Sequence, residues 1–325
     1  MTENTDRRKP IVGWLIRLIA ATGLIIYLIA SEKLDFRMLA ERKIHYEFII
    51  LALLVYTLTN LKGIVRWKIL LLAVGIKTRF LTILRLTYLG HIFSIMLPGV
   101  VGGDAVKAIL LHREQKERFS ISITSAFGDR IIGTIAMLAL IISVAPFLER
   151  SALLKSQTLA ILFVLAIIFA VSLVLFLFST RLEKPLKRLF IRLPFRRFTL
   201  RVIIASFTFR RKFFYSLIAF LISLPAHILS VVAVLCCIKA IGFDAPFLPL
   251  TYAVLVGLLI EALPISIAGF GVGEQAFEWL FSVLLAGGVA TAGAEVALLM
   301  HLTRIFAAAP GLVFLFISKR TKKIT

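Results

Sequence analysis

The chain has 325 residues, of which 60% are hydrophobic, and its mean hydropathy is +0.99. Soluble globular proteins are about 45–50% apolar, so this excess excludes an ordinary soluble protein and indicates a chain surrounded largely by lipid. The 38 basic and 17 acidic residues give a formal net charge of +21. The basic residues lie in short stretches between long apolar segments, so the charge indicates membrane orientation and excludes nucleic acid as the partner.

The first two apolar segments are predicted to be membrane spans. Residues 11–30 are long enough to cross about 30 Å of hydrocarbon, and no small-residue cleavage pattern of a signal peptide follows them. The second segment, 48–61, is predicted to extend to Trp67. Residues 31–47 are neutral, whereas residues 62–79 carry five basic residues and no acid. We therefore expect residues 31–47 to face outward and residues 62–79 to be cytoplasmic.

Residues 80–111 are apolar but are interrupted in the middle. The interruption contains Leu97-Pro98-Gly99 and then Gly102-Gly103-Asp104. We predict a re-entrant helical hairpin that enters from the cytoplasm and returns there, so that residues 112–118 are also cytoplasmic. Broken backbone at membrane depth must be buried in protein or line a polar cavity.

Two ordinary spans and a strongly basic loop follow. Residues 120–146 and 159–179 are the predicted spans, and residues 148–156 between them are expected to face outward. The loop 181–212 contains eleven basic residues and one acid, which places it in the cytoplasm. A span over residues 213–238 comes next, with Pro225 as its expected kink.

A second interrupted segment, 247–286, resembles the first. It contains Leu263-Pro264, then Gly269, Gly271 and Gly273, and then Glu274. We predict a second hairpin, entered from the outside. A last span over residues 294–317 ends in a basic tail, which is expected to be cytoplasmic.

Together these elements predict a single all-α integral membrane domain over residues 1–325. It has about six full spans and two re-entrant hairpins in an inverted-topology repeat. The first repeat covers about residues 10–147 and the second about 157–318. The alternative is eight to ten ordinary spans in which proline and glycine are tolerated. The charge pattern places both termini in the cytoplasm, at a bacterial or archaeal cytoplasmic (inner) membrane.

Ionisable residues inside the membrane cost about 2.5–3.5 kcal/mol each, so each one needs a role. In the first hairpin, Asp104 and Lys107 are one helical turn apart. Asp104 either caps a half-helix or, with Gly102 and Gly103, forms a cradle whose backbone N–H groups face an anionic headgroup.

The next span carries two adjacent ionisable residues, Asp129 and Arg130. Their side chains point about 100° apart on a helix, so we expect them to have different partners. Arg130 either binds phosphate through its planar fork or holds the hairpin by pairing with Asp104 or Glu274.

The second half offers Glu274, which follows the glycines, and Arg304, with His301 on the same helical face. Glu261, Glu278 and Glu295 are weaker candidates, expected nearer the outer interface. Arg85 is either a cytoplasmic-side ligand or a snorkelling residue. His91, His227, Cys236 and Cys237 are expected to pack rather than to react. The predicted substrate-binding residues are therefore Gly102, Gly103, Asp104, Lys107, Asp129, Arg130, Gly271, Gly273, Glu274 and Arg304.

The sequence has no recognisable catalytic or metal-binding motif. It lacks GxSxG, HExxH, the P-loop pattern and any Cys/His metal set. We therefore predict that the protein is not an enzyme and that it needs no cofactor and no metal.

The motifs together resemble the lysylphosphatidylglycerol synthase transmembrane (flippase-like) family. The residues that carry the resemblance lie between about 10 and 318: Arg66-Trp67, Leu70-Leu71, Gly90, Leu97-Pro98-Gly99, Gly102-Gly103-Asp104, Asp129-Arg130, Pro264 and Gly269 to Glu274. The resemblance implies lipid movement across the bilayer, of aminoacylated phospholipids or polyprenyl-linked sugars. Lys107 stands where the family often has arginine, which keeps the charge but not bidentate phosphate recognition.

Members of that family that make aminoacylated lipid carry a large soluble transferase domain after the membrane part. This sequence ends at Thr325, so we expect a stand-alone membrane domain without the synthase activity.

The favoured hypothesis is a lipid transporter or flippase that moves a phospholipid or polyprenyl-linked headgroup. The alternatives are a membrane enzyme or subunit of lipid-linked glycan or aminoacyl-lipid metabolism, and a non-catalytic scaffold that docks such an enzyme through residues 181–212. Charges that recur in both halves favour transport. The expected partners are membrane lipids with anionic or zwitterionic headgroups, an enzyme of lipid modification and a second copy of the chain.

Overall fold

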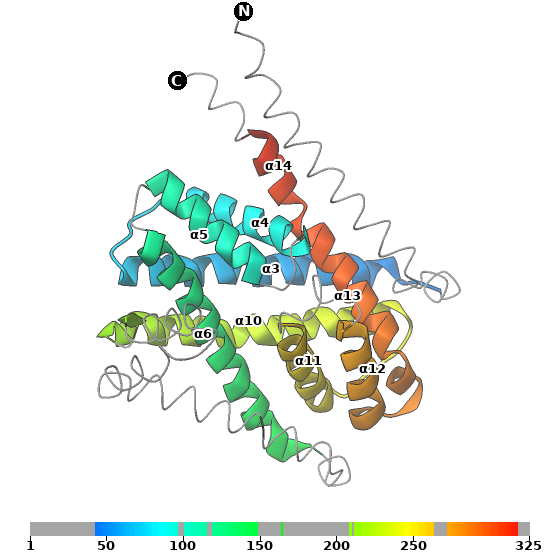
Figure 1. The fold of residues 1–325 in the computed structure, drawn as a ribbon. Coiled ribbons are helices and arrows are strands. Elements are labelled where there is room, and N and C mark those ends of the chain that lie inside the picture. The colour runs from blue at the N-terminus through cyan, green and yellow to red at the C-terminus, as the bar shows by residue number, and fades with distance from the viewer. Residues whose placement is uncertain are drawn as a thin grey trace, which may run out of the picture.

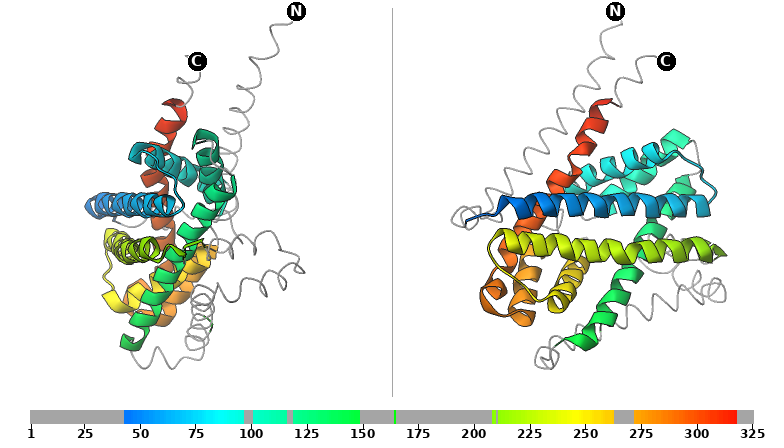
Figure 2. Two further views of the ribbon diagram at one scale, coloured as in Figure 1. Left: turned by 90° about the vertical axis from the view of Figure 1, so that its left-hand side faces the viewer. Right: turned by 180° about the vertical axis from the view of Figure 1, so that it is seen from behind.

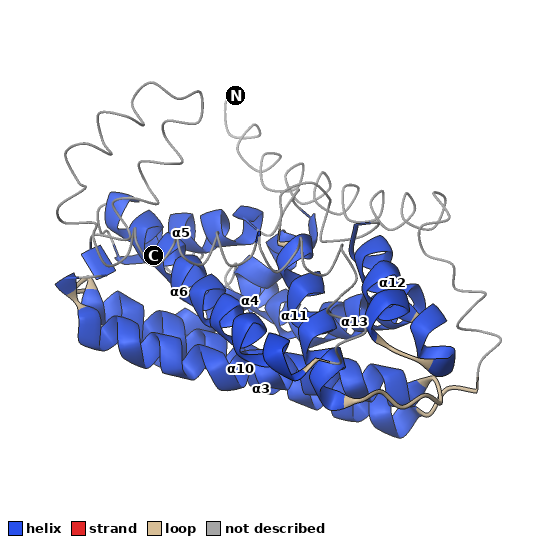
Figure 3. Cartoon of the chain, turned by 90° about the horizontal axis from the view of Figure 1, so that it is seen from below, coloured by secondary structure: helices blue, strands red, loops and turns tan. Residues whose placement is uncertain are grey.

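The computed structural model describes residues 43–96, 101–115, 119–148, 164, 208–209, 211–262 and 272–317, and these residues form helices joined by short loops, with no strand among them (Figures 1 and 3). This confirms the all-α prediction. The predicted spans 11–30 and 159–179, most of the loop 181–212 and both Leu-Pro breaks lie outside the described residues. The helices are α3 (Tyr46–Ala73), α4 (Phe80–Met96), α5 (Val101–Gln115), α6 (Phe119–Val144), η1 (Ala145–Phe147), α10 (Phe213–Ala240), α11 (Phe247–Glu261), α12 (Val272–Leu284), η2 (Gly287–Thr291), α13 (Gly293–Ala308) and α14 (Pro310–Ile317).

Four stretches of the described chain are long and apolar enough to cross a membrane. They are Tyr46–Ala73, Ile121–Phe147, Phe213–Ala240 and Gly293–Phe314. Large apolar side chains also cover the outside of the molecule, for example Ile50, Leu54 and Leu58 on α3. Because a water-soluble protein rarely exposes so large a contiguous apolar surface, these helices are those of a multi-pass membrane protein.

The long helices α3 and α10 lie side by side and antiparallel (Figures 1 and 2). The backbone N–H of His45, just before α3, donates to the carbonyl of Ala240 at the end of α10, at 2.8 Å. Helix α3, which contains the predicted second span, continues past Trp67 to Ala73. Part of the expected cytoplasmic segment 62–79 is therefore helical.

The ends of α3 and α10 are built in the same way. Both helices have 28 residues, and both are followed by a glycine with positive φ, Gly75 (87°) and Gly242 (81°). The N–H groups of these glycines and of the next residues bond back to the last turn, which is a Schellman motif. The next helices begin at Phe80 and Phe247, at the same distance from each glycine. This likeness is what a repeat of the chain's two halves would produce.

Helices α4 and α5 form the first hairpin. At its base, Gln115 donates to Thr78 (3.3 Å) and Arg85 pairs with Glu114 (2.5 Å). Arg85 therefore ties the two arms together. The start of the first arm, at residue 78, and the end of the second arm, at residue 115, therefore lie at the same end of the hairpin, as a hairpin requires. Nearer the tip, a Cβ on Gly103 would overlap the Gly90 carbonyl, so only glycine allows this approach.

Helices α11 and α12 form the second hairpin, in which the Phe277 ring lies against Gly257. The chain then continues into α13 through η2. The predicted last span, 294–317, is interrupted: α13 ends at Ala308 and α14 begins at Pro310. Proline lacks a backbone N–H and clashes with the preceding turn, so it starts a new helix instead of continuing the old one.

The main hydrophobic core joins α3, α6, α10, α11, α12 and α13. Cys236 and Cys237 are free thiols buried in this core, which confirms that they act as small packing residues. The two halves of the chain are thus packed into one body, and the space between them is where the polar residues gather.

Candidate functional site

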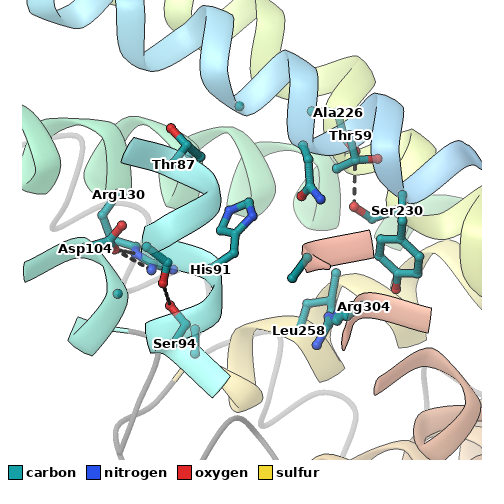
Figure 4. A pocket seen from close by; sticks show the side chains of 18 of the residues that line it. Thr59, Thr87, His91, Ser94, Asp104, Arg130, Ala226, Ser230, Leu258 and Arg304 are labelled. Atoms are coloured by element: carbon teal, nitrogen blue, oxygen red, sulfur yellow. Dashed lines mark hydrogen bonds and ion pairs between the residues drawn. The ribbon is translucent and has the colours of Figure 1, made fainter. Parts of the chain in front are cut away.

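A cavity of about 420 Å³ lies between the halves, lined by α3 to α6 from one and by α10, α11 and α13 from the other (Figure 4). The lining residues recur every three or four positions along each helix, which places them on one face. On α3 they are Tyr56, Thr59, Asn60, Gly63 and Arg66. The corresponding faces of the other helices are Thr87, Gly90, His91 and Ser94 on α4; Gly103, Asp104 and Lys107 on α5; Asp129, Arg130, Gly133, Thr134 and Met137 on α6; Ala226, His227 and Ser230 on α10; Leu258, Glu261 and Ala262 around the end of α11; and His301, Arg304, Ile305, Ala307 and Ala308 on α13.

Five residues of the first half form a continuous chain of ion pairs, which we call the first charge cluster: Arg66, Asp129, Lys107, Asp104 and Arg130. Asp129 accepts from Arg66 Nε at 2.7 Å and from Lys107 Nζ at 3.2 Å. Asp104 accepts from Lys107 Nζ at 3.1 Å and from Arg130 Nη2 at 2.5 Å. The charges alternate in sign along the cluster, so each carboxylate serves two cations.

Lys107 is the centre of this cluster. Its ammonium contacts both aspartates and lies 4.6 Å from the centroid of the Trp67 ring, a cation–π arrangement. Its side chain is only 8% exposed. An ammonium buried this deeply needs several partners, and the two aspartates supply them.

The structure corrects one expectation about Asp104. It is the fourth residue of α5 and not the residue that precedes the helix, and its carboxylate pairs with Arg130 and Lys107. The helix-cap interpretation is therefore wrong. The prediction that Asp129 and Arg130 have different partners is confirmed, because Asp129 pairs with Arg66 and Lys107.

The second half has a matching set, which we call the second charge cluster: Glu274, His301, Glu261 and Arg304. His301 Nε2 lies 3.0 Å from Glu261 Oε1, and Nδ1 lies 3.1 Å from Glu274 Oε1. The other oxygen of Glu261 accepts from Arg304 Nη1 at 2.6 Å. Arg304 also lies over the Tyr56 ring of α3, with 5.9 Å to the centroid. The cluster thus links α11, α12 and α13 and touches the first half.

Two of the predicted glycines permit these contacts. A Cβ on Gly273 would lie 2.7 Å from Glu261 Oε1 and 3.0 Å from the His301 ring. Gly103 allows α4 and α5 to approach and lines the cavity. Gly102 lies in the first turn of α5 outside the cavity lining, and Gly271 is outside the described residues.

Three members of the clusters were not predicted as binding residues from the sequence. Arg66 belongs to a segment that is expected to be cytoplasmic, but its side chain turns inward and also donates to Ser223 Oγ at 3.1 Å. The polar residues at three- and four-residue spacing before it on α3 were the available signal. Glu261 is only a weaker candidate from the sequence, but the structure buries it and pairs it with His301 and Arg304. His301 was noted only as a neighbour of Arg304.

His91 and His227 both line the cavity, and His227 Nε2 lies 2.9 Å from the Gly133 carbonyl. Among the residues that the structure describes, no three His, Cys, Asp or Glu side chains are placed to hold a metal ion.

Comparison with known proteins agrees with this architecture. The family model described as "Lysylphosphatidylglycerol synthase TM region" matches residues 14–311. The chain belongs to this family. A relative, a UPF0104 membrane protein of Methanothermobacter thermautotrophicus, is 25% identical over 241 residues, which cover 67% of this chain and 68% of the relative. No solved structure matches the chain. Membership of this family, with the four long apolar helices, makes the chain a multi-pass membrane protein with a lipid-related role.

Proposed function

We propose that this protein moves the headgroup of a phospholipid or polyprenyl-linked lipid across the cytoplasmic membrane, through the cavity between its halves. The observation that carries this proposal is that one cavity receives a guanidinium from each half, Arg130 from α6 and Arg304 from α13. Ionisable residues inside membrane helices characteristically mark substrate pathways.

The size of the cavity suits a headgroup. Pockets for small molecules have volumes of about 300–1,000 Å³, and this one measures about 420 Å³. A polar headgroup could occupy it while the acyl or prenyl chains stay in the surrounding lipid. The apolar outer faces of the helices are suited to that contact.

Both arginines are placed to exchange partners. Arg130 holds Asp104 through Nε (3.0 Å) and Nη2 (2.5 Å), and Arg304 holds Glu261. Their side chains are 38% and 32% exposed, much more than those of Lys107 and Asp129 at 8% each. A headgroup phosphate could replace a carboxylate as the partner of either guanidinium, because the planar fork fits both groups.

The antiparallel α3 and α10 with their matching ends, and the hairpin that follows each of them, support an inverted-topology repeat. In such a repeat the cavity would open to opposite sides as one half moves against the other. We propose this arrangement with both termini in the cytoplasm, as the basic residues suggest.

The test is lipid movement in vesicles that contain the purified protein and a trace of fluorescent phosphatidylglycerol. A membrane-impermeant reductant bleaches only outer-leaflet lipid, so a transporter lowers the fluorescence that stays protected. Arg130→Lys and Arg304→Lys keep the charge but remove the fork, and we expect each to slow lipid movement at least tenfold. Such a loss corresponds to one bidentate phosphate contact of about 1.5–3 kcal/mol.

The matched control is Arg79→Lys, an exposed arginine between α3 and α4 that does not line the cavity. It should leave the rate unchanged. If both cavity variants move lipid as fast as the wild type, the arginines only hold the hairpins. If the wild type itself moves no lipid, the transport proposal falls and a role as subunit or scaffold of a lipid-modifying enzyme replaces it.

A further inference from the structure

His301 lies between two carboxylates, and this geometry bears on how many protons its imidazole ring carries. Both ring nitrogens are at hydrogen-bond distance from a carboxylate oxygen, 3.0 Å to Glu261 and 3.1 Å to Glu274. An ionised carboxylate can only accept a hydrogen bond, and a neutral imidazole has only one N–H to donate. With both glutamates ionised and the ring neutral, one nitrogen would face an oxygen with no hydrogen between them.

A doubly protonated ring removes this conflict. As an imidazolium, His301 donates to both glutamates, and the four described side chains of the second charge cluster then carry two positive and two negative charges. Without that proton these four side chains carry a net charge of −1. The side chains of His301, Glu261 and Glu274 are 2%, 5% and 10% exposed, so water offers little compensation. A buried cluster that is neutral overall is favoured over one with an unbalanced charge.

The groups around the ring agree with this assignment. Glu261 on α11 and Glu274 on α12 contact it directly, and Arg304 follows one turn later on α13. Because Gly273 has no side chain, α12 can lie close to Glu261 and to the His301 ring. Other titratable side chains on the described helices that pack against α13 include Tyr56 on α3, His91 on α4, Cys237 on α10 and Glu278 on α12.

We propose that His301, held between Glu261 and Glu274, is a proton-binding site, and that an anionic headgroup and this proton favour each other's binding. The second part rests on the function proposed above. A phosphate that takes Arg304 from Glu261 brings a negative charge and removes the countercharge of that glutamate. Both changes favour the imidazolium, and by linkage the proton favours the phosphate equally. A proton gradient could then drive lipid movement.

The proton site is tested without any transport measurement. The full-length protein is labelled with ¹⁵N-histidine, and the ring-nitrogen signals are recorded in detergent micelles as the pH is varied. The chain has five histidines, so His301→Gln identifies the signal by its disappearance. At pH 7 we expect both ring nitrogens of His301 to be protonated. A neutral ring with one bare nitrogen at this pH would overturn the assignment.

Glu274→Gln supplies a second and sharper variant. The amide of glutamine can donate to Nδ1, so the ring no longer needs the extra proton. We expect His301 to become neutral, with its proton on Nε2, and this change also identifies the signal if His301→Gln does not fold. Glu278→Gln is the matched control: it lies one turn later on α12, where Glu278 accepts from the Ala294 N–H at 2.9 Å. It should leave the His301 signal unchanged, and an unchanged signal in Glu274→Gln itself would also contradict the proposal.

Coupling is tested by adding dihexanoyl phosphatidylglycerol to the same sample. We expect His301 to keep its second proton to a higher pH when this lipid is present, and identical titrations would overturn the coupling. In vesicles, an imposed pH gradient should change the rate of lipid movement. Vesicles that move lipid without a protonated His301 would refute the proton site alone. A protonated His301 in a protein that moves no lipid would refute the proposed transport alone.

Discussion

The two charge clusters occupy matching places in the two halves but differ in chemistry. The first cluster alternates two guanidinium groups and one ammonium with two aspartates. The second alternates two glutamates with Arg304 and with His301, and imidazole is the side chain whose ordinary pKa lies closest to neutral pH. Under the proposal above, the second cluster would bind a proton, whereas the first has no imidazole that could do so.

The comparison also separates the buried residues from the accessible ones. In each cluster an arginine at one end is the most exposed member, Arg130 at 38% and Arg304 at 32%, whereas Lys107 and His301 in the middle are 8% and 2% exposed. A buried centre with fixed partners holds the helices together, whereas an exposed end can exchange its partner for a ligand. The predictions below test this division.

The largest difference is expected from the same carboxyl-to-amide change in both clusters. Asp129→Asn removes the charge that serves Arg66 and Lys107, so two buried cations lose a partner. We expect a loss of about 3–5 kcal/mol in stability, seen as a much lower melting temperature of the purified protein in detergent. Glu274→Gln should cost less than about 1 kcal/mol, because its amide can donate to His301. Equal melting temperatures for the two variants would refute the difference between the clusters.

A smaller difference is expected from adding one methyl group at the matching glycines. In Gly103→Ala the new Cβ would overlap the backbone carbonyl of Gly90, so α4 and α5 must separate, at about 1–3 kcal/mol. In Gly273→Ala the Cβ meets the side-chain ends of Glu261 and His301, which can move. We expect Gly273→Ala to lower the melting temperature less than Gly103→Ala but to shift the His301 ring signals. The opposite order of melting temperatures would contradict the packing described here.

The smallest effect concerns the hydroxyl that supports Arg66. Ser223 Oγ accepts from Arg66 and donates to the Ala219 carbonyl, so Ser223→Ala removes one hydrogen bond to a buried guanidinium. We expect a loss of about 1 kcal/mol in the same melting experiment. Ser230→Ala on the same helix is the control, since that hydroxyl donates to its own helix at Ala226. A loss at Ser230 as large as at Ser223 would show that Arg66 does not depend on the hydroxyl.

The sequence by itself determined the class of the protein and the places where polar groups had to be explained. Apolar segments of span length can fold only as helices in lipid, because the backbone must satisfy its own hydrogen bonds there. The Leu-Pro and glycine interruptions predicted hairpins, and the described parts of both are pairs of short helices. Burying a charge in lipid is costly, and this cost identified Asp104, Asp129, Arg130, Glu274 and Arg304 as candidate functional residues.

Only the tertiary structure decided which charges meet. Helical periodicity fixes the face on which a side chain lies, but not the depth or the angle at which two helices cross. For that reason the sequence could not distinguish Asp104 from Glu274 as the partner of Arg130. In the packed structure Arg130 pairs with Asp104. Packing likewise turned Arg66 inward to Asp129, 63 positions away along the chain, and brought Glu261 to Arg304 across 43. Those distant pairings arise from helix packing, which no local pattern of residues encodes.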